Sequence, residues 1–135
     1  IILLVAKSGS QEKFEAGEIY VRRALAIIND QYDTDIDIGK ISKELGISQA
    51  YLHRLSRQYL DTTLHEYLSQ LRIDKALKYL ENTNMPIVDV AIGCGFNNRQ
   101  SFYKAFQKYQ GCSARDYRNK IQLQNDRLIG GHDME

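Results

Sequence analysis

The sequence contains few of the residues that define several classes of protein. One Pro and nine Gly among 135 residues exclude collagen-like repeats and Pro-rich linkers. Two cysteines, Cys94 and Cys112, are too few for a disulfide scaffold or a four-ligand metal site. The longest apolar run, residues 1–6, is much shorter than the roughly 20 residues that span a bilayer. We therefore expect no metal, no cofactor and no membrane partner.

The beginning of the chain does not combine a charged start with a long apolar stretch, so we expect a cytoplasmic protein rather than an exported one. The first residue is Ile1 rather than Met, and we expect the chain to be a piece of a longer protein. Its length suits one ordinary domain or two very small ones, and its 43% apolar residues are enough to form a core.

The charged residues are unevenly distributed. The formal net charge is only +1, yet residues 38–120 carry 13 basic and 7 acidic side chains, a net charge of +6. Residues 1–37 carry −3 and residues 121–135 carry −2. A basic middle with acidic flanks weakly favours an anionic partner, and an ordinary solvated surface explains the same charge.

Almost every segment has the period of a helix, and apart from residues 1–6 no segment has a strand pattern. Val21, Leu25, Ile28 and Tyr32 lie on one face of a helix predicted over residues 18–32. Capping and stop signals predict six more helices, over residues 38–45, 48–60, 63–81, 86–94, 98–109 and 113–120. The expected fold class is therefore all-α, with about seven helices.

The boundaries of these helices follow from residues with known terminal preferences. The expected N-terminal caps are Asp37, Ser48, Thr63 in a capping box with Glu66, Asn97, and Ser113 with Asp116. Pro86 suits a first helical turn, and Gly46, Gly95 and Gly111 are expected to end helices.

An internal repeat is the most informative feature. Ile41-Ser42-x-x-Leu45-Gly46-Ile47-Ser48 matches Val90-Ala91-x-x-Cys94-Gly95-Phe96-Asn97 at an offset of 49, and the helices that follow match at an offset of 50. In each copy a small residue lets two helices cross closely, and a Gly supplies the positive φ of a tight turn. The repeat predicts two helix-turn-helix motifs joined by a long linker helix, and it places Cys94 in the core.

The second helix of each copy has one apolar face and one face without a carboxylate. The outward faces carry Ala50, His53, Arg54 and Arg57 in the first copy, and Gln100, Tyr103, Lys104 and Gln107, with Arg99 beside them, in the second. A helix face that is only solvated usually mixes charge signs. Arg, Gln and His can hydrogen-bond base edges in a major groove, and Lys can pair with phosphate, so these faces indicate DNA binding.

The expected spacing of the two faces also suits DNA. A linker helix over residues 64–80 would be about 25 Å long at roughly 1.5 Å per residue. With helix widths added, the two outward helices would lie about one DNA turn apart, ~34 Å. One chain would then enter two adjacent major grooves.

Three stretches carry a family pattern: Arg72-Ile73-x-x-Ala76-x-x-Tyr79-Leu80, Ile87-x-x-Val90-Ala91-x-x-x-Gly95-Phe96-x-x-x-x-x-Phe102-x-Lys104-x-Phe106, and Gly111-x-Ser113-x-x-x-Tyr117-Arg118. Through them, residues 18–120 resemble the DNA-binding domain of the AraC/XylS transcription regulators. The resemblance implies a seven-helix fold with two motifs, a bacterial source and a role in switching promoters. It also implies base reading by Gln49, Ala50, His53, Arg54, Arg99, Gln100, Tyr103 and Lys104.

Other contacts are expected around these residues. Lys43, Ser48, Arg57 and Asn97 are the candidates for phosphate contacts. The alternatives to base reading are a phosphate contact or a surface position for Arg54, a phosphate contact for Lys104 and a solvated surface for His53. For Tyr103 they are packing on a sugar or a thymine methyl, or a surface position. The chain departs from the family pattern at Ser42, Ser56, Asp61 and Ala114, where Ala, Phe, Gly and Pro are usual, and Ser56 predicts a less tightly packed first motif.

The expected organisation has five parts: a stub or linker from a missing upstream domain (1–17), a first helix-turn-helix subdomain (18–62), a linker helix (63–82), a second subdomain (83–120) and a tail (121–135). The expected partners are double-stranded promoter DNA, RNA polymerase, and a second copy of the protein bound through the missing upstream domain.

Two alternatives to a DNA-binding regulator remain open. One is a protein-interaction module that kept the fold without DNA binding. The other is the DNA-docking half of a repair enzyme with a cysteine alkyl acceptor, although no upstream cysteine cluster is present. No Cys–His–acid or Ser–His–acid group comes together in the helical layout, so we expect no enzyme activity in this chain.

Overall fold

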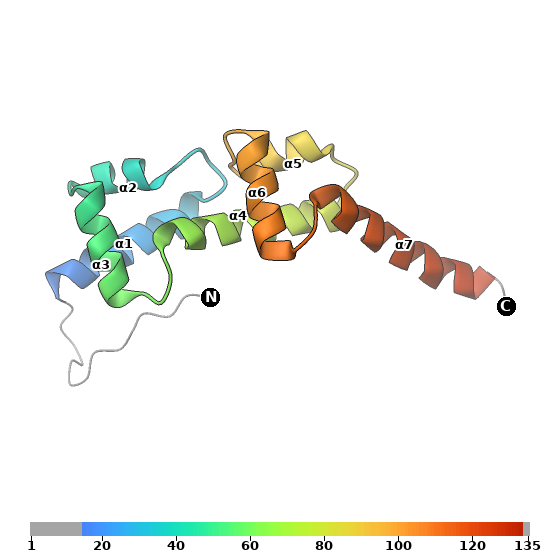
Figure 1. The fold of residues 1–135 in the computed structure, drawn as a ribbon, viewed down its shortest axis with the longest axis horizontal. Coiled ribbons are helices and arrows are strands. Elements are labelled where there is room, and N and C mark those ends of the chain that lie inside the picture. The colour runs from blue at the N-terminus through green and yellow to red at the C-terminus, as the bar shows by residue number, and fades with distance from the viewer. Residues whose placement is uncertain (1–14, 134–135) are drawn as a thin grey trace. The chain divides into compact units, whose positions relative to one another are not determined.

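The computed structural model describes the backbone of residues 15–133 and the side chains of residues 15–128. Seven α-helices and no strand lie within this part of the chain (Figure 1): α1 Ala16–Gln31, α2 Ile38–Leu45, α3 Gln49–Tyr59, α4 Leu64–Asn82, α5 Ile87–Gly93, α6 Arg99–Gln110 and α7 Ala114–Asp133. The predicted all-α fold with two helix-turn-helix motifs is confirmed. The strand pattern noted over residues 1–6 lies outside the described residues.

The described residues divide into two compact units between Leu71 and Arg72, so the boundary between the units falls inside α4. Each unit has its own hydrophobic core, which draws on α1 to α4 in the first unit and on α4 to α7 in the second. Each core therefore supports one helix-turn-helix motif, α2 with α3 or α5 with α6. The proposed five-part organisation remains a prediction.

The first core is built on the predicted face of α1. Val21 and Ile28 are buried completely, and Leu25 and Tyr32 are half-buried against the same core. Ala24 also lies on the buried face, where its small side chain fits between helices. The remaining buried side chains are Ile41, Leu52, Leu55, Tyr59, Leu60, Leu64 and Leu68.

Short polar contacts fix the ends of the helices in the first motif. The Asp37 carboxylate accepts the backbone N–H of Lys40 at 2.8 Å, and the Ser48 hydroxyl accepts that of Tyr51 at 3.0 Å. Gly46 between them has φ = 75°, which an L side chain rarely adopts. These contacts confirm both predicted caps and the predicted turn.

The predicted capping box at the start of α4 involves one more residue than expected. The Thr63 hydroxyl accepts the backbone N–H of Glu66 at 3.0 Å, as the pattern predicts. The Glu66 carboxylate accepts the hydroxyl of Thr62 at 2.8 Å. Both threonines therefore help to fix the first turn of α4.

Aromatic side chains dominate the core of the second unit. Phe102 and Phe106 of α6 are completely buried and their ring centroids lie 5.7 Å apart. Phe96 contacts Phe102 edge-on at 5.4 Å, a favourable arrangement for two aromatic rings. Cys94 is completely buried in the same cluster, which confirms its predicted role in the core.

Two boundaries in the second unit differ from the prediction. Asn98, rather than Asn97, caps α6, because its side chain accepts the backbone N–H of Ser101 at 2.8 Å. The second turn is thus one residue longer than the first, which accounts for the change of repeat offset from 49 to 50. The prediction that the last helix ends near Lys120 was wrong, since α7 continues to Asp133. No Gly or Pro interrupts residues 114–129.

The start of α7 is fixed to the end of α4. The Arg118 guanidinium donates to the carbonyl oxygens of Met85 at 2.6 Å and Thr83 at 3.3 Å, in the loop after α4. The Tyr117 hydroxyl donates to the Glu81 carboxylate at 2.8 Å. Burial and this hydrogen bond raise the pKa of Tyr117 to about 12, so the phenol remains a hydrogen-bond donor to Glu81 even at moderately alkaline pH.

Candidate nucleic-acid interface

The outward face of α3 is exposed to solvent. Leu52, Leu55 and Tyr59 are buried on the opposite side of the helix. The predicted base-reading residues Gln49, Ala50, His53 and Arg54 are all exposed, as is Arg57 in the last turn. The predicted division of α3 into an apolar and a donor-rich face is therefore confirmed, whereas the individual contacts remain predictions.

The Arg54 side chain packs on Tyr51, which in turn contacts Tyr20. Its guanidinium carbon lies 5.1 Å from the centroid of the Tyr51 ring, within the range of a cation–π contact. Tyr51 in turn contacts Tyr20 of α1 edge-on, with ring centroids 6.3 Å apart. Arg54 is thus held against a surface that belongs to the core of the first unit, which limits the freedom it would lose on binding.

The phosphate candidates of the first motif surround this face. Lys43 is exposed in the last turn of α2 and Arg57 in the last turn of α3. Ser48 is exposed at the N-terminus of α3, where its oxygen accepts the backbone N–H of Tyr51. Its hydroxyl proton can still be donated to a phosphate oxygen.

The outward face of α6 has the same accessibility but a different chemistry. Arg99, Gln100, Tyr103 and Lys104 are exposed, and Tyr103 retains 46% of its accessible surface. None of these side chains carries a negative charge. Asn97 is exposed in the turn before α6, although it is not the cap, and its predicted phosphate contact remains a prediction.

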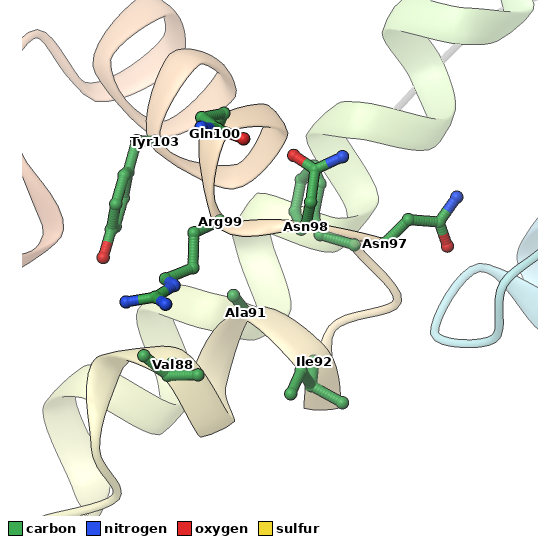
Figure 2. Close-up of a pocket in the computed structure, with 9 residues that line it drawn as sticks. Val88, Ala91, Ile92, Asn97, Asn98, Arg99, Gln100 and Tyr103 are labelled. Atoms are coloured by element: carbon green, nitrogen blue, oxygen red, sulfur yellow. The ribbon is translucent and has the colours of Figure 1, made fainter.

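The second motif also contains exposed apolar residues that sequence reasoning missed. Val88 and Ile92 of α5 are 37% and 65% exposed, and both line a recess of about 520 Å³ beside the start of α6. Figure 2 shows the side chain of Arg99 extending from α6 toward Val88, with Tyr103 beside it. The available signal was a second apolar pair, at i and i+4, on a helix that already buries Val90 and Ala91.

Other kinds of site find no support in the described residues. Within residues 15–133 no three His, Cys, Asp or Glu side chains gather in a way that could hold a metal ion. No helix in the same part of the chain is both long and apolar enough to cross a membrane.

Comparison with known proteins points to transcription regulators. A family model described as a helix-turn-helix domain matches residues 41–120. The Msm operon regulatory protein of Streptococcus mutans is 30% identical over 112 residues, which are 83% of this chain and 40% of that protein. The HTH-type transcriptional activator RhaS of Escherichia coli is 29% identical over 118 residues, 87% of this chain and 42% of that protein. The chain thus spans about two-fifths of the length of these relatives.

A solved structure agrees with these similarities. The C-terminal domain of AraT, a response regulator from Geobacillus stearothermophilus, superposes with a TM-score of 0.70 at 29% sequence identity. The match covers 78% of this chain and 88% of that domain.

Proposed function

Because this chain belongs to the helix-turn-helix family of AraC/XylS-type DNA-binding domains, we propose that it binds double-stranded DNA in a sequence-specific manner. The observation that carries the proposal is the exposure of two outward helix faces, on α3 and α6, which carry donors and no carboxylate. Each face lies opposite a buried apolar face, so its side chains are held in place by a packed core.

The chemistry divides between the phosphate backbone and the bases. Lys43 and Arg57 would neutralise phosphates and release counterions, which makes the affinity fall steeply as salt rises. Arg54 and Gln100 would donate hydrogen bonds to base edges in the major groove, where each base pair has its own pattern of donors and acceptors. The other residues of the two faces, Gln49, Ala50, His53, Arg99, Tyr103 and Lys104, would complete the contacts.

The two motifs would enter adjacent major grooves. This part of the proposal is supported by the presence of one exposed recognition helix in each unit and by the continuous helix α4 that connects the units along the chain. A site of two half-sites, about 10 base pairs apart, follows from the helical repeat of DNA.

A longer regulator that contains this domain would act in the cytoplasm on promoter DNA. It would contact RNA polymerase and dimerise through a further domain. The 135-residue chain would then be monomeric by itself, and sedimentation at micromolar concentration measures this directly. A stable dimer would show instead that this domain carries its own dimer interface.

Base reading is tested by substitutions measured on two kinds of DNA. A duplex selected by the 135-residue chain from a random library supplies the cognate site. Arg54→Ala and Gln100→Ala should each weaken cognate binding by about 5- to 150-fold, the value of one bidentate base contact, and weaken binding to random duplexes much less. Gel-shift titrations at fixed salt measure both losses.

Matched controls come from the same units. Arg23→Ala on α1 and Gln124→Ala on α7 remove exposed side chains of the same types that do not belong to α3 or α6, and should leave both affinities unchanged. Equal losses on cognate and random DNA for Arg54→Ala and Gln100→Ala would contradict base reading. No salt-sensitive DNA affinity, together with early elution from heparin, would favour a protein-interaction module.

A further inference from the structure

The recess between α5 and α6 is apolar on one side and polar on the other. Val88 and Ile92 form the side contributed by α5, and Arg99 and Gln100 line the recess from the first turn of α6. Single apolar side chains are common on protein surfaces. Two of them in one recess beside a recognition helix suit a partner that is itself partly apolar and partly polar.

The recess is continuous with the DNA-reading surface. Arg99, Gln100 and Tyr103 belong both to its lining and to the outward face of α6 (Figure 2). None of the side chains that line it is acidic, so a negatively charged duplex meets no repulsion from within the recess. A ligand that reaches the exposed face of α6 would therefore also cover Val88 and Ile92.

The internal repeat shows that these apolar residues are particular to the second motif. At the offset of 49, Val88 and Ile92 correspond to Gly39 and Lys43 of α2. Lys43 is exposed and suits a phosphate contact, whereas Ile92 offers only apolar surface at the corresponding position. The second motif thus exchanges a cation for a hydrocarbon beside its recognition helix.

One base of DNA has an apolar group in the major groove, namely the C5-methyl group of thymine. We propose that Val88 and Ile92, together with the ring of Tyr103, form a contact surface for thymine methyl groups in the half-site read by α6. The inference rests on the proposed DNA binding and specifies which base the second motif prefers. Donors on Arg99 and Gln100 would bond the neighbouring base edges.

Replacing thymine by deoxyuridine tests this inference, because it removes the methyl group and preserves base pairing. In the selected cognate duplex each thymine is replaced singly. At one or more positions of one half-site the affinity of the 135-residue chain should fall by about fourfold, the effect of one methyl group withdrawn from an apolar contact. In Ile92→Ala the same replacement should have little further effect.

Leu123→Ala provides the matched control, because Leu123 is an equally apolar and exposed side chain on α7 outside the recess. It should retain the full sensitivity to deoxyuridine. Val88→Ala offers a second variant with a smaller volume change and should reduce the sensitivity in part. Circular dichroism of each variant verifies that the helical content is unchanged.

The possible outcomes separate the inference from the function on which it rests. Sensitivity that Ile92→Ala removes and Leu123→Ala keeps supports the inference. A cognate duplex that is bound selectively but is insensitive to every deoxyuridine overturns it and leaves DNA binding intact. Sensitivity that survives in both Val88→Ala and Ile92→Ala also overturns it, because α5 then takes no part in contacting the methyl groups. Failure to select any duplex overturns the proposed function and the inference together.

Discussion

Corresponding positions in the two motifs carry different side chains. The first motif presents Lys43, Arg54 and Arg57, and the second presents Arg99 and Lys104 together with the apolar surface of Ile92 and Tyr103. A cation is attracted to phosphates of any sequence, while an apolar group beside amide donors depends on the base edge that it meets. On the proposed function, the second motif would therefore depend more than the first on the base edge that its apolar side chains meet.

The hydrophobic cores of the two units also differ at corresponding positions of the repeat. Ser42 and Ser56 of the first unit correspond to Ala91 and Phe106 of the second, at offsets of 49 and 50. Both hydroxyls are satisfied, since Ser42 donates to the Gly39 carbonyl at 2.9 Å and Ser56 to the Leu52 carbonyl at 2.7 Å. The first core therefore holds polar groups at positions where the second holds a methyl group and a complete aromatic ring.

The largest effect is expected when the second core receives the residue of the first. Phe106→Ser should lower the free energy of unfolding by about 4 kcal/mol, because it removes a completely buried ring that contacts Phe102 and Tyr117. Urea unfolding followed by circular dichroism measures the change. The neighbouring exposed residue gives the control, Gln107→Ser, which should stay within about 0.5 kcal/mol.

If Phe106→Ser lowers the free energy of unfolding only slightly, the second core tolerates the same residue as the first. The difference between the cores would then have no energetic consequence. Ser56→Ala makes the complementary test in the first core. It removes a hydroxyl that bonds within its own helix, so it should change the free energy of unfolding by only about 1 kcal/mol.

The next largest effect concerns the cooperation of the two motifs on DNA. Five base pairs inserted between the half-sites rotate one of them to the opposite side of the duplex, because DNA completes a turn in about 10 base pairs. If both motifs bind at once, the affinity of the 135-residue chain should fall at least about 100-fold, since the contacts of one motif are lost. Fluorescence anisotropy with labelled duplexes measures this.

An insertion of ten base pairs restores the original side of the duplex and moves the half-sites about 34 Å further apart. A chain that reaches only adjacent grooves should bind this duplex as weakly as the one with five added base pairs. Unchanged affinity with five added base pairs would show that a single motif accounts for binding. Only one of the two exposed helix faces would then contact DNA.

Much of this arrangement could be predicted from single residues. Asp37, Ser48 and Ser113 cap helices as their types predict, and the helical period places Leu52 and Phe102 in the cores. These features depend on a few neighbours along the chain. They are enough to identify which faces of α3 and α6 reach the solvent.

Other features depend on choices that the sequence leaves open. Asn97 and Asn98 are equally suited to cap α6, and only the path of the longer turn selects Asn98. The extent of α7 was missed because no residue between 121 and 129 marks an end. The recess was missed because it arises from the packing of α5 against α6, and the second apolar pair on α5, Val88 and Ile92, does not show by residue type that it stays exposed.

The smallest expected effect concerns the salt dependence that distinguishes the two motifs. Two separate variants exchange the corresponding residues: Lys43→Ile removes a cation from the first motif, and Ile92→Lys adds one to the second. A phosphate contact contributes about 0.9 to the slope of log affinity against log salt, so Lys43→Ile should make the slope shallower by about that amount. Ile92→Lys should make it steeper only if the position beside α6 also faces a phosphate.

This last variant distinguishes two explanations of the exchange in the repeat. If Ile92→Lys steepens the slope and abolishes the sensitivity to deoxyuridine, the two positions occupy equivalent places on DNA and the second motif has given up a phosphate contact for a methyl contact. If the slope is unchanged and the sensitivity is lost, Ile92 lies over the bases rather than the backbone. If both remain as in the original chain, Ile92 lies away from the duplex, and the difference between the motifs lies within α3 and α6 alone.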